Sequence, residues 1–301
     1  MPETLKVGVQ LPEVEREAGW LEIRDVARTA EEVGLDSIWF GDHLLYRDDT
    51  FGVRGPLETW AILAALGEAT ERVSLGPLVA CTSFHAPAML AKKAATVDEI
   101  SGGRLILGLG AGWNQTEYDG FGFPFDHRID RFEEAFTIIR TLLSEGHVDF
   151  EGTYYTVRGA ELAPRARPGI PLLVGSNGPR MLAITLPYVS MWNSWHASFG
   201  NQLSGLAPLL EEIDHAAAGA GREPGEVEKT VSIYIQLPGG TGRVTGRGVL
   251  LDDVPHTGSR EDLAQLLRDY AAIGISHVQL VLDPIDSASV EEMGEVIRLV
   301  D

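Results

Sequence analysis

An acid and an imidazole stand side by side at Asp42 and His43, directly after the apolar run at 37–41. Histidine titrates near neutral pH, so its imidazole can give or take a proton during a reaction. The pair therefore indicates acid–base chemistry. The plain alternative is that Asp42 caps the following loop and His43 only packs.

Two glycine-rich segments could admit a flat ring or a phosphate. Residues 108–113 read GLGAGW, and residues 175–178 read GSNG just before Pro179. Glycine lets a ligand approach the backbone closely, and a glycine-rich turn at a helix start offers N–H groups to an anion. The first segment has the spacing GxGxG and no amphipathic helix directly after it, so a Rossmann site is not predicted. Both segments could instead be purely structural.

Other chemistries find little support in the sequence. The eight histidines form no HxH or HxxxH pair, and Cys81 is the single cysteine, so no metal site, disulfide or CxxC motif is predicted locally. The segment at 174–182 is not GxSxG, which argues against a hydrolase nucleophile. The run MWNSWH at 191–196 could line an aromatic slot, although tryptophans more often pack.

The charge balance limits the partners. The chain of 301 residues has 44 Asp and Glu against 24 Lys and Arg, a net charge of −20. So acidic a surface repels nucleic acid and anionic lipid, and we expect neither as a partner. With no signal-like or membrane-spanning apolar run, and one cysteine, we expect a cytoplasmic protein.

The elements that must position these residues alternate between short apolar runs and longer amphipathic stretches, which favours parallel strands joined by helices. Eight such units predict an α/β fold, a (β/α)8 TIM barrel, as a single domain over 1–301. Polar residues at the carboxyl ends of its strands then meet at one mouth. The expected strands are Leu5–Gln10, Ser37–Gly41, Val73–Val79, Leu105–Leu109, Pro171–Gly175, Val189–Asn193, Val231–Gln236 and His277–Leu282.

Two segments interrupt this rhythm. Residues 146–170 predict an insertion between the fourth helix and the fifth strand. Residues 237–258 are glycine-rich and too long for a routine connection after the seventh strand. We interpret them as a mobile lid over the mouth or as plain disorder.

Several segments together resemble the luciferase-like oxidoreductases (the bacterial luciferase superfamily), and within them the branch that depends on coenzyme F-420. The long run PAMLAKKAATVDEISGGRLILGLGAGW is the most specific. The others are SIWFGDHLL, LETWAILAALGEATERVSLGPLV, RFEEAFTIIRTLL, FEGTYYTV, PLLVGSNGPRML and YAAIGISHVQLVL. They span nearly the whole chain.

The resemblance implies a barrel with a flavin or deazaflavin across its carboxyl-terminal mouth. Asp42 and His43 then match the polar pair beside the reactive ring, with His43 as proton donor or acceptor. A non-prolyl cis peptide is implied around Leu78 and Val79. The implied cofactor contacts are Leu78, Val79, Ala111, Gly112, Trp113, the phosphate loop Gly175, Ser176, Asn177 and Gly178, and Trp192.

This sequence departs from the family pattern at three places. Ser190 and Met191 precede Trp192 where relatives carry an Asp and a small residue, and Leu78 is bulkier than expected. Trp113 replaces the acid found in the sugar-phosphate dehydrogenases of the branch. A sugar-phosphate substrate is therefore not implied.

The leading hypothesis is an oxidoreductase that moves a hydride between coenzyme F-420 and an unidentified small organic substrate, expected to be a homodimer. One alternative is an FMN-dependent monooxygenase of the same family, served by a separate flavin reductase. Another is a non-catalytic flavin-binding barrel, or a lyase or hydrolase using Asp42, Glu117 and Asp283. Candidate cations for the anionic tail of F-420 are Lys92, Lys93, Arg165, Arg167 and Arg180.

Overall fold

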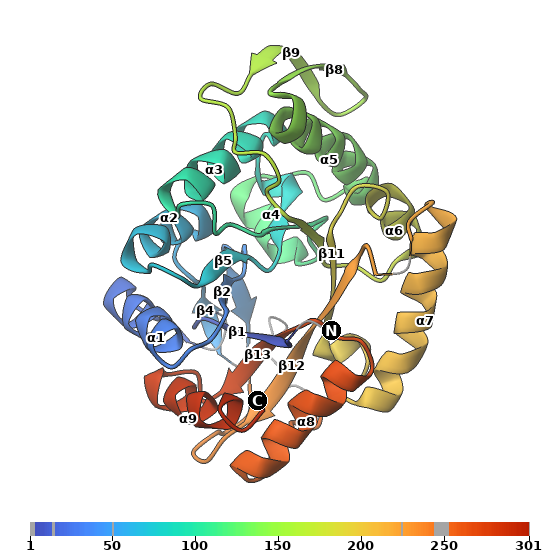
Figure 1. Ribbon diagram of the computed structural model, residues 1–301. Helices are drawn as coiled ribbons and strands as arrows, with labels where there is room; N and C mark the ends of the chain where they lie inside the picture. Colours follow the sequence, from blue (N-terminus) through green and yellow to red (C-terminus); the bar gives the residue numbers. More distant parts are fainter. Residues whose placement is uncertain (1–3, 14–15, 50, 224, 244–252, 301) are drawn as a thin grey trace.

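The computed structural model describes residues 4–13, 16–49, 51–223, 225–243 and 253–300. Within them, nine parallel strands form one barrel sheet, and helices surround it (Figure 1). The sheet order is β5-β2-β1-β13-β12-β11-β10-β7-β6. The strands are β1 Lys6–Gln10, β2 Ser37–Phe40, β5 Ser74–Pro77, β6 Ala80–Cys81, β7 Leu107–Gly110, β10 Leu172–Val174, β11 Met191–Trp195, β12 Glu228–Gln236 and β13 His277–Asp283. The predicted barrel class is confirmed.

The helices pack their apolar faces on the outside of this barrel. They are α1 Trp20–Glu32, α2 Thr59–Ala69, α3 Pro87–Ile100, α4 Gln115–Phe121, α5 Arg128–Glu145, α6 Pro179–Thr185, α7 Leu203–Gly219, α8 Arg260–Ala272 and α9 Ser287–Ile297. On α7, for example, Leu206, Leu210 and Ile213 are buried at helical spacing. Each helix begins near the carboxyl end of the strand before it, which leaves the strand ends free to carry a site.

The predicted third strand, Val73–Val79, is wrong as one element. Only its part Ser74–Pro77 is a strand, β5, which pairs with β2, and a separate strand, β6, follows at Ala80–Cys81 and pairs with β7. Between them the Leu78–Val79 peptide bond is cis, at the place that the resemblance implies. A bridge between Leu75 and Leu105 joins β5 to the start of the β7 segment. The two strands together close the barrel.

The predicted sixth strand was placed two residues too early. Val189–Asn193 was expected, whereas β11 is Met191–Trp195, paired with β12 from Glu228 onward. Successive side chains of β11 point to opposite faces of the sheet. As a result Asn193 lies inside the barrel, where its Nδ2 donates to Thr230 Oγ1 and Gln279 Oε1.

Two hairpins extend the barrel. The predicted insertion at 146–170 contains the antiparallel pair β8 His147–Glu151 and β9 Thr156–Glu161, seen beyond α5 in Figure 1. A second hairpin, β3 Tyr46–Asp48 with β4 Gly52–Arg54, follows β2 and was not predicted. A short helix, α4, follows the glycine-rich strand end, where no helix was expected. The segment 237–258 was interpreted as a lid or as disorder. Its residues 244–252 lie outside the described residues, so this interpretation is not tested.

None of the helices in the described part of the chain is both long and apolar enough to span a membrane.

Candidate active site

The candidate site is centred on His43, directly after β2. Its Nδ1 lies 3.1 Å from both Oε1 and Oε2 of Glu117, which comes from α4. Glu117 is itself buried, and Oε1 accepts hydrogen bonds from the N–H groups of Leu44 and Leu45. The carboxylate therefore holds the imidazole and the loop after it in one position. Among the described residues, none forms a hydrogen bond with Nε2 of His43.

The surroundings of His43 favour its charged form. Burial opposes the positive charge, but the hydrogen bond and charge of Glu117, with the charges of Glu13 and Asp42, outweigh it and raise the pKa of His43. The ring also lies beside Tyr46, at 4.9 Å between centroids. An imidazole with a raised pKa can carry its proton at neutral pH and give it to a substrate.

Asp42 lies next to His43 in the chain but points to other partners. Its Oδ2 accepts from Nε2 of His85 and from the N–H of Cys81, both at 2.9 Å. Nδ1 of His85 is 3.4 Å from Nζ of Lys93. Asp42 thus links β2 to β6 and acts on His43 through charge, rather than by a direct contact with it.

Glu13, after β1, was missed by the sequence reasoning. It is buried, accepts from Nε2 of Gln10 at 2.5 Å, and bonds the N–H of Gly41. Burial raises its pKa, although His43, that N–H and Arg243 act in the opposite direction. The signal that could have found Glu13 is the same as that of Asp42, a carboxylate soon after a strand end. Glu13, however, lies three residues beyond Gln10, the last residue of β1, rather than directly after the strand. His85 was passed over for the same reason.

The glycines of β7 and β10 make room for Val79. A Cβ on Gly108 would lie 2.9 Å from Val79 Cγ1, one on Gly110 would lie 2.7 Å from Cγ2, and one on Gly175 would lie 3.0 Å from Cγ1. Gly108 and Gly110 therefore leave the space that the Val79 side chain fills. Val79 and Leu78 remain partly accessible above them. The cis segment therefore forms a small apolar platform at the barrel end.

The turn after β7 holds Ala111, Gly112 and Trp113. Gly112 has φ +74°, and a Cβ there would meet Tyr118 Oη and Cys81 Sγ. The Ala111 carbonyl accepts from Tyr118 Oη at 2.7 Å. The turn is thus packed from one side, and Trp113, 46% exposed, projects from it.

The loop Gly175 to Gly178 precedes α6, as predicted. Asn177 Nδ2 donates to Ser194 Oγ at 3.1 Å, while its buried Oδ1 has no hydrogen-bond partner in the structure described. A Cβ on Gly178 would meet only Ser176 Oγ, at 3.8 Å. The loop therefore leaves backbone open on one side.

Trp192 does not line the mouth, which corrects the interpretation of residues 191–196 as an aromatic slot. Its side chain is fully buried, and its Nε1 donates to the Ser176 carbonyl at 3.0 Å. The reason is the alternation of side chains along β11, which turns Asn193 into the barrel and Trp192 toward the helices, and leaves Trp195 at the strand end. Trp192 supports the loop 175–178 from behind.

Most of the candidate tail cations lie elsewhere. Arg167 donates to the Gly102 carbonyl and Arg165 to the Ser144 carbonyl, both near the amino ends of the strands. Lys92 bonds the Ala163 carbonyl. Arg180 lies close to the loop, but it forms ion pairs with Asp130 and Glu133. Of these five side chains, only Lys93 lies near His43, because it contacts His85, the hydrogen-bond partner of Asp42.

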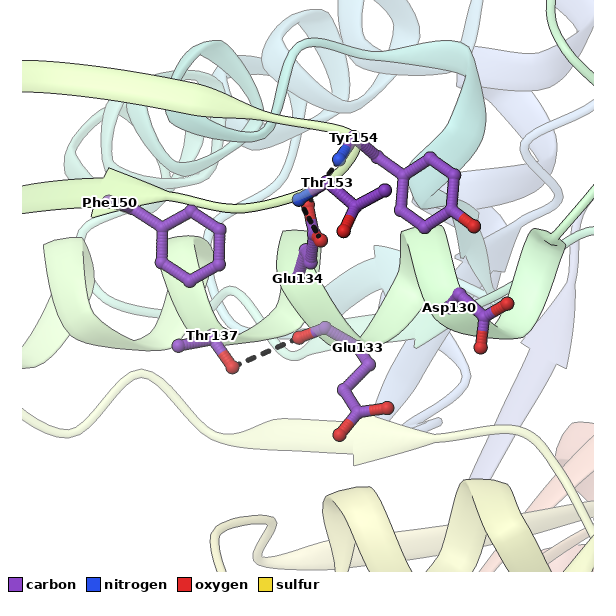
Figure 2. A pocket seen from close by; sticks show the side chains of 7 residues that line it. All are labelled: Asp130, Glu133, Glu134, Thr137, Phe150, Thr153 and Tyr154. Carbon is purple, nitrogen blue, oxygen red and sulfur yellow. Dashed lines mark hydrogen bonds between the residues drawn. The ribbon is translucent and has the colours of Figure 1, made fainter.

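A groove of about 480 Å³ lies outside the barrel, between α5 and the β8–β9 turn (Figure 2). Glu134 reaches across it and accepts from the N–H groups of Thr153 and Tyr154. The acidic wall of the groove also includes Asp130 and Glu133. None of the residues around His43 lines this groove, so it is distinct from the candidate site.

A second histidine–carboxylate pair lies at the end of β11. Nδ1 of His196 is 2.6 Å from Oδ2 of Asp253, and the buried Nε2 has no hydrogen-bond partner in the structure described. The ring packs against Trp195 and Tyr234. Burial lowers the pKa of His196, although Asp253 acts in the opposite direction.

Comparison with known proteins gives a consistent family. The model of the luciferase-like monooxygenase family matches residues 5–237. An F420-dependent glucose-6-phosphate dehydrogenase of Amycolatopsis mediterranei (strain U-32) is 35% identical over 182 residues, 58% of this chain and 53% of the relative. A 5,10-methylenetetrahydromethanopterin reductase of Archaeoglobus fulgidus (strain ATCC 49558) is 32% identical over 166 residues, 55% of this chain and 46% of the relative.

The match to these two curated relatives spans about half of their length. Among solved structures, an F420-dependent secondary alcohol dehydrogenase, solved in complex with an F420-acetone adduct, superposes with a TM-score of 0.82. That alignment covers 99% of both chains at 21% identity. At this identity the likeness shows the shared barrel fold and no more.

Proposed function

The chain belongs to the luciferase-like monooxygenase family, and from that premise we propose that it transfers a hydride between coenzyme F-420 and a small organic substrate. The observation that carries the proposal is the His43–Glu117 pair at the carboxyl ends of the strands, with both carboxylate oxygens 3.1 Å from Nδ1. This arrangement presents a proton-carrying group where barrel enzymes bind substrate. The name of the F420-dependent glucose-6-phosphate dehydrogenase supports the choice of cofactor.

The residues at the barrel end suit a deazaflavin. The platform of Leu78 and Val79 above the β7 and β10 glycines offers a flat ring an apolar surface. The open backbone at Gly178, at the start of α6, leaves room for the phosphate end of the cofactor at a helix N-terminus. Leu78, Val79 and the loop 175–178 would therefore hold the cofactor, and the turn 111–113 would border it.

The bound deazaflavin supplies or accepts the hydride in a two-electron step. His43 handles the proton that accompanies it. Glu117 fixes Nδ1, so Nε2 is the nitrogen that exchanges a proton with a substrate oxygen or nitrogen. In the oxidation of an alcohol, Nε2 takes the hydroxyl proton. In the reduction of a ketone, the imidazolium returns it, and the three nearby carboxylates stabilise its charge.

Titration of the purified protein with F-420 and with FMN, in oxidised and reduced forms, tests the proposal. We expect saturable binding of F-420, followed by cofactor fluorescence, and much weaker binding of FMN. Preference for reduced FMN, with dioxygen uptake when a flavin reductase is added, would favour the monooxygenase alternative. Lack of binding to either cofactor would overturn both.

A matched pair of variants locates the cofactor. Gly178→Val fills the open side of the loop without straining its extended backbone, and it should weaken F-420 binding roughly tenfold because the phosphate end would lie there. Ser194→Ala removes only the partner of Asn177 Nδ2 and should change binding less than about threefold. Equal effects of both variants would move the phosphate site away from this loop.

A further inference from the structure

We propose that the substrate is an uncharged alcohol or ketone whose reacting carbon carries an apolar, aromatic group, and that this group lies against Trp113. The inference rests on the proposed function, since it assigns the substrate class of the same site. It comes from the aromatic and charged side chains that surround His43.

Trp113 is placed to contact a substrate that His43 protonates or deprotonates. Its indole is 46% exposed and stands edge-on to the His43 imidazole, with centroids 5.8 Å apart and planes at 72°. Tyr46 flanks the same imidazole at 4.9 Å. A substrate oxygen at Nε2 would therefore have aromatic surface close by, and an exposed indole face binds flat apolar groups well.

The position of Trp113 is fixed by its neighbours in the chain. The Gly112 carbonyl accepts from Nη1 of Arg128 at 2.6 Å. Asn114 caps α4 through the N–H of Thr116, and its Nδ2 donates to the Leu45 carbonyl at 3.0 Å. The turn is thus tied both to α5 and to the loop after His43. These hydrogen bonds fix the backbone on both sides of Trp113, so its indole presents a well-positioned aromatic surface.

The charges around His43 disfavour an anionic substrate. Glu13, Asp42 and Glu117 are all buried beside the imidazole. Each of these carboxylates already has a partner: His43 for Glu117, Arg243 for Glu13, and His85 with Lys93 beside it for Asp42. A charged substrate group close to the reacting carbon would be buried here without a counter-charge of its own, which is costly.

The guanidinium groups near this end of the barrel are already engaged. Arg54 pairs with Asp48. Arg128 donates to the Gly112 carbonyl and lies over the Phe125 ring at 4.2 Å. Arg243 is buried and donates to Gln10 Oε1. An anionic substrate would have to displace these partners, whereas an uncharged one needs no counter-charge.

Three secondary alcohols of matched shape test the inference. They are 1-phenylethanol, its para-carboxylate and its para-trimethylammonium derivative. Their binding to the protein, with and without F-420, is followed by saturation-transfer NMR, and their oxidation by loss of F-420 fluorescence. We expect kcat/KM for the neutral alcohol to exceed that for the carboxylate at least about tenfold, because burying a charge without a counter-charge is costly. Equal use of the anion, or a clear preference for the cation, would overturn the inference.

Variants at position 113 assign the effect to the indole. Trp113→Glu should raise KM for 1-phenylethanol roughly tenfold with a smaller change in kcat, while Trp113→Phe should restore most of the loss, because a ring remains. Ile273→Glu adds the same charge to a partly exposed side chain before β13, at the opposite end of the barrel, and controls for net charge. A KM that does not respond to Trp113→Glu would contradict the role of Trp113.

The two proposals fail in different ways. If F-420 does not bind but the neutral alcohol still binds better than the anion, the proposed function falls and the substrate class stands. If F-420 binds and is reduced by all three alcohols alike, the function stands and the substrate class falls.

Discussion

His43 and His196 are two histidines at the same end of the barrel, each with a carboxylate on Nδ1, yet their environments push them in opposite directions. Glu117 lies 3.1 Å from His43, and Asp253 lies 2.6 Å from His196. The pKa of His43 is raised, whereas burial lowers the pKa of His196. The closer carboxylate thus belongs to the histidine that resists protonation.

The difference lies in what surrounds each pair. The His43 side chain keeps 19% of its surface exposed and faces the further carboxylates Glu13 and Asp42. The His196 side chain is fully buried, and within the described part of the chain Asp253 is the one charged group that acts on it. Desolvation of a cation is costly, and a single partner does not offset it here. A histidine–carboxylate pair can therefore exchange protons near neutral pH only where further negative charges stabilise the imidazolium and part of the ring is exposed.

The largest expected effect is on turnover at His43. His43→Ala should lower kcat about 10²–10⁴-fold, the usual contribution of a positioned acid or base, with little change in F-420 affinity. The matched variant His196→Ala should lower kcat less than about tenfold, because an imidazole that stays neutral and buried cannot take the same part. Steady-state kinetics and cofactor titration measure both. Similar losses of kcat in the two variants would erase the distinction.

Removing the negative charge of Glu117 should bring His43 closer to His196 in behaviour. Glu117→Gln should lower the pKa of His43, shift the rate–pH profile toward lower pH, and slow turnover roughly tenfold, since a hydrogen bond to a charged group contributes about 1.5–3 kcal/mol. NMR titration of the imidazole measures the pKa directly. Asp253→Asn is the control and should leave the rate–pH profile in place. A profile that stays fixed in Glu117→Gln would exclude Glu117 from tuning the proton.

His196 should matter for stability instead. His196→Phe keeps the ring packing against Trp195 and Tyr234 but leaves Asp253 without its donor, which should lower the free energy of unfolding by about 1–3 kcal/mol. Chemical denaturation measures this loss. An unchanged midpoint would mean that the His196–Asp253 contact does not help to hold residues 253–256 on the barrel.

The smallest effects are opposite slopes of stability against pH. The lowered pKa of His196 means that the unfolded chain binds the proton more readily, so this stability is lost as the pH falls below the ordinary range of histidine. The raised pKa of His43 contributes stability at low pH that is lost as the pH rises through its folded value. Denaturation of His196→Phe and His43→Ala across this range should flatten the two slopes separately. Slopes of the same sign would contradict the comparison.

Some features of the fold depend on local chemistry alone. The capping box at Ser259 and Asp262 starts α8, and Gly34 and Gly274 follow helices at φ +95° and +94°. These features depend on only a few neighbouring residues. The alternation of strands and helices, whose ends they mark, was enough to predict the barrel class. His43, Asp42 and the loop 175–178 were found because the residue following a strand end is readable from the chain alone.

Tertiary structure decided which of these residues meet. Glu117 lies 74 positions after His43, and Asp42 reaches His85 across 43 positions, contacts that no local pattern contains. The packing of the barrel and its helices buried Trp192, whereas Trp195 lies at the strand end. Local sequence determines backbone preference and periodicity, whereas the pKa of His43 depends on burial and on charges brought together from β1, β2 and α4 only when the barrel closes.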